Sequence, residues 1–427
     1  MKKIYFPLLF FLLLLLVSCE RKQENSLIQQ KKTTISLAYS WGYGFKNVIE
    51  DFKNRVSNDF ILETEENIGL NHKQKILIDV SSNIVPDVFC FWSYETNLKY
   101  LADKDFLLNI DEYFNTSTKI KRTDFYEESL EATLIDGVNY GIPHERFFGF
   151  FAVNKSILDE YNIAIPKTWD DLIDMGKILN PKGIVPLSMG SFRGDPGHLF
   201  FSALTYQNVN GFSDTEKMKN TNNFIYPGTI NAAEAVVTLI NNNVVPNNTI
   251  YEGSYDRQVD IYNKREAAAI FAFSWSLALF DYDIAQNTLF IPVPLISNES
   301  VNTNEFTIGG TAQSICISKK AWSDPEKREA IITLVDWLLS DEVFNIRMEQ
   351  SGCYPTKIME LPQMVNPIFE KATNYLNRTK LLGIHEFYFN SLNSFNQYKE
   401  ANDLLWSGAI GRDDFLQMVQ NSMEGGD

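Results

Sequence analysis

Apolar residues along this chain recur at two alternating spacings, one typical of strands and the other typical of helices. Residues 33–39 alternate between apolar and polar side chains like a strand, and residues 45–52 place apolar side chains on one face of a helix. A helical pattern over residues 72–81, a short buried strand over 86–91 and a second helical pattern over 94–101 follow. Strands that alternate with helices predict α/β lobes built on mainly parallel sheets.

The middle and the end of the chain repeat this alternation. The patterns predict an extended segment over residues 138–153, helices over 168–179, 232–241 and 326–339, and a buried strand over 266–275. The first of these helices has Thr168 in front of it, a residue type that suits an N-cap. A chain of 427 residues exceeds the size at which a single core keeps growing, so we expect two lobes.

The N-terminus has the composition of an export signal. Lys2 and Lys3 precede an apolar run over residues 4–17, which charged residues end directly after Cys19. A basic start followed by such a run is typical of a secretory signal peptide. The alternative is an uncleaved membrane anchor, which the length disfavours because a transmembrane helix needs about 20 apolar residues.

The segment Leu16-Val17-Ser18-Cys19 resembles the lipobox of bacterial lipoproteins. The resemblance implies cleavage that removes residues 1–18, and attachment of acyl chains such as palmitate to Cys19. Several acyl chains on one residue would hold the protein at a membrane. Residues 19–32 are then expected to form a lipid-anchored tether, because their polar, Gln/Lys-rich composition is typical of flexible segments.

Charge and cysteine content exclude several kinds of site. The formal net charge is −16 and no Lys/Arg cluster is obvious, which disfavours nucleic acid as a partner. Besides Cys19 the chain contains only Cys90, Cys316 and Cys353, in apolar or strand-like surroundings. An odd number of cysteines implies no complete disulfide framework, so buried free thiols are expected, and no pair has zinc-ligand spacing.

No catalytic signature is recognisable in the sequence. The chain has no H-E-x-x-H, G-x-S-x-G or P-loop motif, and Asp195 with His198 provides too few ligands for a metal site. We therefore expect no catalytic residue, no metal and no cofactor. A carboxylate pair of a glycoside hydrolase would leave no such signature, so a carbohydrate-active surface lipoprotein remains an alternative.

Several segments, in order, resemble the family 1 extracellular solute-binding proteins of sugar ABC importers, the class that includes maltose-binding protein. The segments are Pro86-Asp87-Val88-Phe89, Tyr140-Gly141-Ile142-Pro143 with Val153-Asn154-Lys155, Pro166-Lys167-Thr168-Trp169, Ala267-Ala268-Ala269 with Ser274-Trp275, Gly309-Gly310 with Ile315-Cys316-Ile317-Ser318, and the helix over 324–339. Phe273 stands where the family has a glycine before its Ser-Trp pair, and Val153 replaces the family tyrosine.

The resemblance implies a two-lobed periplasmic-binding-protein-like fold of type II, in which the chain crosses between the lobes about three times and the lobes close around ligand. Lobe 1 is expected to contain residues 33–144 and 295–340, and lobe 2 residues 145–294 and 341–427. The implied function is capture of a sugar or oligosaccharide outside the cytoplasm, for delivery to ABC permease subunits, by a monomer that catalyses nothing. A binding protein for another small solute, such as a polyamine, remains open because a cation would use carboxylates and aromatic faces.

Sugars present hydroxyl groups at the ring edge and apolar C–H patches on the ring faces, so their sites combine aromatic rings with polar groups. Residues of these types occur at the family's ligand-facing positions and after the predicted strands. The candidate ligand-binding residues are Trp41, Tyr43, Trp92, His144, Glu145, Arg146, Phe192, Arg193, Asp195, Trp275, Gly309, Gly310 and Tyr354.

Each candidate also has a structural interpretation. A tryptophan is more often a packing residue than a ligand platform. Glu145 with Arg146 could be a surface ion pair of little energetic value, and Arg193 with Asp195 could be an ordinary pair in a solvated loop. Their positions near predicted crossovers and strand ends are the reason for proposing them as ligand-binding residues.

Overall fold

The structure is a computed structural model that describes residues 32–425, apart from Tyr43, Tyr94, Asn247 and residues 249–253, 298–299 and 302–304. The predicted signal peptide, Cys19 and nearly all of the predicted tether lie outside the described residues. No helix of the described part of the chain is both long and apolar enough to cross a membrane.

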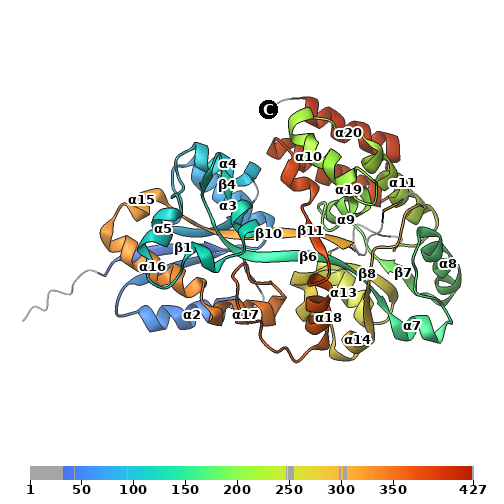
Figure 1. The fold of residues 1–427 in the computed structure, drawn as a ribbon, viewed down its shortest axis with the longest axis horizontal. Coiled ribbons are helices and arrows are strands. Elements are labelled where there is room, and N and C mark those ends of the chain that lie inside the picture. The colour runs from blue at the N-terminus through green and yellow to red at the C-terminus, as the bar shows by residue number, and fades with distance from the viewer. Residues whose placement is uncertain are drawn as a thin grey trace, which may run out of the picture.

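Strands and helices alternate along most of the chain (Figure 1). The strands are β1 (Thr34–Tyr39), β2 (Ile61–Glu66), β3 (Val88–Trp92), β4 (Leu134–Ile135), β5 (Val138–Asn139), β6 (Ile142–Asn154), β7 (Val185–Ser188), β8 (Ala267–Phe273), β9 (Thr288–Ile291), β10 (Phe306–Ile317) and β11 (Lys380–Leu382). The helices before β8 are α2 (Phe45–Val56), α3 (Leu70–Ser81), α4 (Glu95–Asp103), α5 (Asp111–Thr116), η1 (Arg122–Asp124), α6 (Glu127–Glu131), α7 (Lys155–Glu160), α8 (Trp169–Leu179), η2 (Asn180–Lys182), α9 (Gly197–Thr205), α10 (Gly211–Thr221), α11 (Pro227–Asn241) and α13 (Tyr255–Asn263). Those after β8 are η3 (Ser274–Leu279), α14 (Tyr282–Asn287), α15 (Lys319–Trp322), α16 (Pro325–Leu338), α17 (Asp341–Ser351), α18 (Pro367–Leu376), η5 (His385–Tyr388), α19 (Leu392–Trp406) and α20 (Arg412–Glu424).

One mixed sheet connects the two halves of the molecule. Its strand order is β2-β1-β3-β10-β6-β8-β7, with β11 paired to β10 and β9 paired to β6. β1 is parallel to β2 and β3, and β7 is parallel to β8, as expected for α/β lobes. The long strands β6 and β10 are antiparallel to each other, β10 is antiparallel to β3, and β6 is antiparallel to β8. The centre of the sheet therefore departs from the expected parallel arrangement.

The two halves are two lobes that share β6 and β10. We use lobe 1 for the half with β1–β3, α2–α5, α15 and α16, and lobe 2 for the half with β7–β9, α7–α11, α13, α14, α18–α20 and η5. Figure 1 shows β6 and β10 running from one lobe into the other. The first part of β6 pairs with β10, and its last residues pair with β8 and β9. The crossovers therefore involve strands shared by both lobes; the residue boundaries expected above stay a prediction.

A third connection between the lobes follows α16. In α17, Val343 and Phe344 belong to a core cluster of lobe 1, whereas Met348 belongs to one of lobe 2. Beyond this helix, the Tyr354 and Arg146 backbones exchange two hydrogen bonds, of 2.8 and 3.3 Å between nitrogen and oxygen. These bonds tie the third connection to β6.

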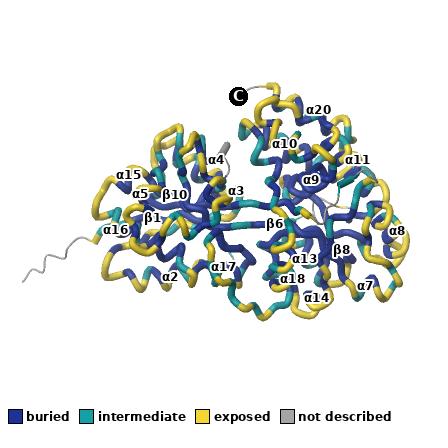
Figure 2. The backbone as a smooth tube through the Cα atoms, viewed as in Figure 1, coloured by how far each residue is buried: buried dark blue, intermediate teal, exposed yellow. Residues whose placement is uncertain are grey.

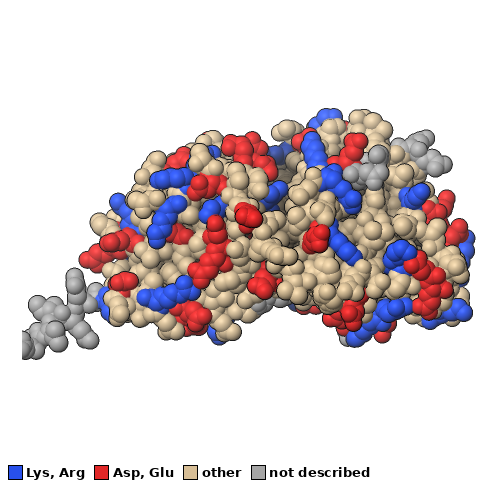
Figure 3. All heavy atoms as spheres, turned by 60° about the horizontal axis from the view of Figure 1, so that its bottom comes forward, with Lys and Arg blue, Asp and Glu red and all other residues tan. Residues whose placement is uncertain are grey.

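Each lobe has its own apolar interior, visible as buried backbone in both halves of Figure 2. Where β6 enters lobe 2, a Cβ added at Gly149 would lie 2.8 Å from the Phe271 ring and 3.1 Å from Ile308. A side chain at this position would force the packed Phe271 ring to shift, so glycine suits this close contact. Figure 3 shows acidic and basic side chains interspersed over one face, which has no continuous basic patch.

The predicted helix starts are confirmed. Thr168 Oγ1 accepts a hydrogen bond from the Asp171 backbone N–H at 3.2 Å, and Asp171 Oδ2 accepts one from the Thr168 N–H at 2.9 Å. This reciprocal capping satisfies N–H groups that have no partner within α8. At the start of α16, the Asp324 side chain caps the helix and Pro325 occupies its first turn, where a missing N–H costs nothing.

Candidate functional site

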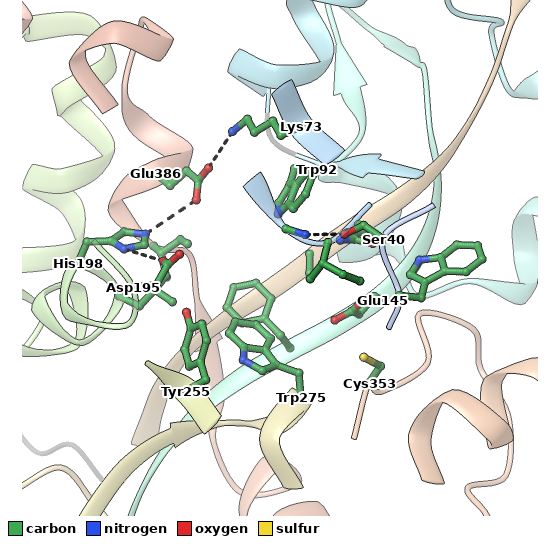
Figure 4. Close-up of a pocket in the computed structure, with 18 of the residues that line it drawn as sticks. Ser40, Lys73, Trp92, Glu145, Asp195, His198, Tyr255, Trp275, Cys353 and Glu386 are labelled. Atoms are coloured by element: carbon green, nitrogen blue, oxygen red, sulfur yellow. Dashed lines mark hydrogen bonds and ion pairs between the residues drawn. The ribbon is translucent and has the colours of Figure 1, made fainter. Parts of the chain in front are cut away.

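A cavity of about 270 Å³ lies between the lobes, against the strands they share. Residues from the ends of β1 and β3, from α3, and from β6 and β10 form one part of its wall. Residues from α9, α13, η3, η5 and α19 of lobe 2 form the opposite part (Figure 4). The volume lies close to the lower end of the range of about 300–1,000 Å³ for small-molecule pockets.

Three tryptophans contribute to the cavity wall. Trp41 follows β1, Trp92 is the last residue of β3, and Trp275 lies in η3, directly after β8. Ligands of α/β proteins bind beyond the carboxyl ends of strands, which is where all three indoles lie. The apolar faces of the site therefore come from both lobes.

Trp275 is fixed by neighbouring rings. Its indole is stacked on Phe273, with centroids 4.6 Å apart and an interplanar angle of 10°. Phe147 and Tyr255, which also line the cavity, have their ring centroids 5.2 and 5.5 Å from that of Trp275. The indole is thus a partly buried ring held in place on one side and facing the cavity (Figure 4).

A buried ion pair lies where the connections between the lobes meet. Arg347 Nη2 of α17 donates to Glu145 Oε2 of β6 at 2.7 Å, and the two side chains are only 3% and 9% exposed. The guanidinium lies 4.9 Å from the Trp41 ring centroid, close enough for a cation–π interaction. Both members of the pair line the cavity.

Several buried polar atoms of the wall have unused hydrogen-bonding capacity. Arg347 Nε and Nη1, Trp41 Nε1, His198 Nε2 and Gln313 Oε1 have no hydrogen-bond partner within the described residues. Gln313 lies at a register irregularity between β10 and β6, a feature that can re-aim side chains. Because buried polar groups are costly when unpaired, these atoms are suited to bind a polar ligand.

A chain of charged and polar groups crosses the cavity. Lys399 Nζ lies 3.0 Å from Asp195 Oδ2, and His198 Nδ1 lies 3.2 Å from Asp195 Oδ1. His198 Nε2 lies 4.0 Å from Glu386 Oε2, and Glu386 Oε1 lies 3.6 Å from Lys73 Nζ of α3. Burial would raise the Asp195 pKa, but Lys399 and His198 outweigh it and hold that pKa below its usual range. Burial lowers the pKa of Lys73, and the charge of Glu386 opposes that shift.

A buried serine–histidine contact inside lobe 2 resembles a nucleophile and its base. Ser202 Oγ is 2.7 Å from His385 Nδ1, and both residues are fully buried. His385 Nε2 faces the Tyr226 hydroxyl at 3.1 Å, not a carboxylate that could orient it as a base. Burial lowers the pKa of His385 to about 3, so this histidine is neutral and its role is to join η5 to α9.

The structure brings some of the sequence candidates together at the cavity. Trp41, Trp92, Glu145, Asp195 and Trp275 line it. A neighbouring hollow of about 180 Å³, which shares Asp195, Ile68 and Tyr255 with the cavity, is lined by Phe192 and Arg193. Tyr43 lies outside the described residues. Whether these side chains contact ligand stays a prediction.

Other candidates lie away from the cavity wall. The His144 ring lies tilted beside Trp41, with centroids 4.8 Å apart, and its Nε2 donates to Leu338 O at 3.1 Å. Arg146 lies over the Tyr126 ring. Tyr354 is buried and its hydroxyl meets Thr373 Oγ1 at 2.9 Å.

The glycine pair at 309–310 has a packing role. A Cβ at Gly309 would lie 2.5 Å from the Phe147 carbonyl oxygen, and one at Gly310, where φ is +152°, would lie 3.2 Å from Phe387. The close approach that these glycines permit is thus to β6 and Phe387.

Only alternate residues of β6 line the cavity. Successive side chains of a strand point to opposite faces, so Glu145 and Phe147 face the cavity while their neighbours point elsewhere.

Lys73, Tyr255, Arg347, Glu386 and Lys399 line the cavity but carry no recognisable sequence signal. Each is a single polar or aromatic residue in a separate helical segment, and nothing in the sequence shows that segments so far apart along the chain meet at one cavity. Cys90, Cys316 and Cys353 are free and buried, as predicted, and burial raises the pKa of Cys90 and of Cys353 to about 12. Among the described residues, no three His, Cys, Asp or Glu side chains are placed to hold a metal ion.

Comparisons with known proteins agree with this architecture. A chitin oligosaccharide binding protein superimposes with a TM-score of 0.81 at 18% identity, covering 92% of this chain and 98% of that one. A structure reported with xylan utilization by the thermophilic bacterium Caldanaerobius polysaccharolyticus gives 0.78 at 20% identity, with 91% and 99% covered. The ABC substrate-binding protein Lmo0181 from Listeria monocytogenes, in complex with cycloalternan, gives 0.72 at 15% identity, with 92% and 98% covered.

These neighbours are two-lobed type II solute-binding proteins, and the shared fold is that of the present chain. No curated protein matches the chain significantly in sequence. The model of the bacterial extracellular solute-binding protein family matches residues 70–343, well over half of the chain. The chain therefore belongs to the bacterial extracellular solute-binding proteins.

Proposed function

We propose that this protein captures a neutral sugar or oligosaccharide by closure of its two lobes and delivers it to the permease of an ABC importer. The observation that carries this proposal is the composition of the interlobe cavity. Indole rings from both lobes lie beside buried donors and acceptors that have unused hydrogen-bonding capacity. A sugar ring needs both, since it offers apolar C–H faces and a rim of hydroxyl groups.

The charges of the cavity favour a neutral ligand over a polyamine. Glu145 is paired with Arg347, Asp195 with Lys399, and Glu386 lies beside Lys73. A cationic ligand would need carboxylates without such partners. The cations already present would also repel it.

Binding is favoured over hydrolysis for two reasons. The family is one of solute-binding proteins, and its structural neighbours are named for binding oligosaccharides. The three cavity carboxylates face cations, whereas a glycosidase needs one carboxyl group in a setting that keeps it protonated as a general acid. Glycoside hydrolysis remains the alternative to be tested.

The sequence of the N-terminus supports a location outside the cytoplasm. We infer that Cys19 carries the acyl chains and that residues 19–32 tether the domain outside the cytoplasm. A solute-binding protein held at the membrane in this way would remain close to its permease.

A ligand screen tests the proposal. The purified protein is heated with each of a panel of mono- and oligosaccharides and with spermidine, and the melting temperature is recorded. Ligand at one hundred times its Kd stabilises the native state by about 2.7 kcal/mol, which a thermal shift detects. A sugar that raises the melting temperature and is recovered uncleaved supports the proposal. A shift with spermidine alone, or release of cleaved glycan by repurified protein, would contradict it.

A further inference from the structure

The chain of charges in the cavity passes from one lobe to the other between Lys73 and Glu386. Lys73 lies on α3 of lobe 1, and Glu386 lies in η5 of lobe 2. Figure 4 shows the two side chains pointing toward each other across the cavity. A contact between the lobes can exist only when the lobes are close together, so the distance between Lys73 and Glu386 depends on lobe closure.

The contacts around Glu386 are longer than hydrogen bonds. The contacts of Asp195 with Lys399 and His198 measure 3.0 and 3.2 Å, within the range of a hydrogen bond. Those of Glu386 with Lys73 and His198 measure 3.6 and 4.0 Å, outside that range. The Glu386 carboxylate therefore lies slightly too far from Lys73 and His198 for direct hydrogen bonds.

These loosely spaced groups are nevertheless buried. The side chains of Lys73, Glu386 and His198 are 8%, 13% and 2% exposed. The Lys73 ammonium lies 5.8 Å from the Trp92 ring centroid and 5.6 Å from that of Phe395, one from each lobe. Buried charges are costly without hydrogen bonds, so a bridging group would be strongly favoured.

His198 provides independent evidence that a ligand group belongs here. Its Nδ1 faces two acceptors, Gly194 O at 3.0 Å and Asp195 Oδ1 at 3.2 Å, so Nδ1 carries a proton and donates. Its Nε2 is buried, faces Glu386 and has no hydrogen-bond partner within the described residues. This atom is aimed at the space beside the Lys73–Glu386 contact.

We propose that Lys73 and Glu386 are a specificity pair, which closes on a hydroxyl group of a neutral sugar and rejects ligands that carry a charge at that position. A hydroxyl both accepts and donates, so it can accept from the Lys73 ammonium and donate to the Glu386 carboxylate. The inference rests on the proposed function, capture of a carbohydrate, and adds which part of the ligand is read and by which residues.

Rejection of both signs of charge follows from having one cation and one anion at the same place. A ligand carboxylate would lie against Glu386, and a ligand ammonium would lie against Lys73. Because the groups are buried, such like-charge contacts are only weakly screened. Repulsion of wrong ligands is a common source of specificity in binding sites.

The test compares variants of the pair with a matched control. Lys73→Met and Glu386→Gln remove one charge each with little change in size. Lys75→Met is the control, because Lys75 lies on the same helix but pairs with Asp79 and Glu65 on the outside. Calorimetry measures the Kd of each protein for glucose, galactose, xylose, N-acetylglucosamine and their disaccharides, and for glucuronate and protonated glucosamine.

The expected result is a change in both affinity and selectivity. Lys73→Met should raise the Kd for the neutral sugar by about 10- to 100-fold, since it removes a charged hydrogen-bond donor. Glu386→Gln should improve binding of glucuronate relative to the neutral sugar by tenfold or more, and Lys73→Met should do the same for glucosamine. Lys75→Met should leave every ratio unchanged.

The outcomes separate the two proposals. If the unaltered protein binds none of these sugars, the proposed function fails and the specificity pair fails with it. If it binds a neutral sugar but the pair variants keep the affinities and ratios of Lys75→Met, the pair alone is refuted. Equal loss of affinity for neutral and charged sugars, in step with lost folding stability, would also overturn the inference, because it indicates a structural role.

Discussion

Replacing Trp275 by alanine tests whether this ring is a ligand platform as well as a packing residue. A fully buried tryptophan replaced by alanine costs about 3–5 kcal/mol of folding free energy. Trp275 is partly buried, since it is stacked on Phe273 and contacts Phe147 on one side while facing the cavity. We therefore expect the free energy of unfolding to fall by about 2–3 kcal/mol.

Binding of a sugar should weaken in addition. Loss of an aromatic contact is worth about 1–3 kcal/mol, so the Kd should rise by about one to two orders of magnitude. Denaturant unfolding without ligand and calorimetry on the same sample give the two quantities separately. Trp169→Ala is the control, because Trp169 is buried in lobe 2, donates its indole N–H to Ala235 O at 3.0 Å and does not line the cavity.

The control should lose stability while the Kd of its folded fraction stays unchanged. If Trp275→Ala behaves in the same way, with lower stability and unaltered affinity, Trp275 does not contact the ligand. Trp275 would then be a core residue, and the assignment of the cavity as the ligand site would lose its main aromatic contact.

Three further predictions concern other parts of the molecule. Arg347→Met should lower the free energy of unfolding by about 3–5 kcal/mol, because it leaves the Glu145 carboxylate buried without its partner. Adding Glu145→Gln should restore a large part of that loss, as measured by denaturant unfolding. No recovery in the double variant would contradict the ion-pair explanation. The unfolded chain binds a proton at His385 below about pH 6.5, whereas the folded chain binds one only near pH 3. The free energy of unfolding should therefore fall by about 2 kcal/mol between pH 7 and pH 5 from this residue alone. His385→Gln should flatten this decline, and an unchanged slope would exclude His385 as its source. Cys19→Ala should block processing or release the protein from membranes, as followed by detergent partitioning, and a variant that matures and partitions like the unaltered protein would rule out lipidation at this residue.

Much of the fold could be predicted because its signals are local. Apolar spacing indicates the strands at β1, β3 and β8, and Thr168 and Asp324 mark helix starts by the chemistry of capping. The direction of the central strands could not be read in this way. Side-chain alternation is the same in parallel and antiparallel strands, so the antiparallel pairing of β6 with β10 depends on how the chain crosses between the lobes.

The site was predictable only where it coincides with strand ends. Trp41, Trp92 and Trp275 follow strands whose carboxyl ends meet at the cavity, so sequence position alone indicates them. A place at a crossover favours His144, Glu145 and Arg146 equally, but which of three consecutive residues faces the cavity depends on the orientation of β6. Lys73 and Glu386 are over 300 positions apart in the sequence, and only tertiary folding brings them together.

A crystal structure of the protein with the tightest-binding sugar of the screen shows directly whether the interlobe cavity is the ligand site. We expect a sugar ring in that cavity, packed against Trp275, with hydroxyl groups within hydrogen-bonding distance of Arg347 or Gln313. A sugar bound elsewhere on the surface, with the cavity side chains arranged as they are without ligand, would contradict it.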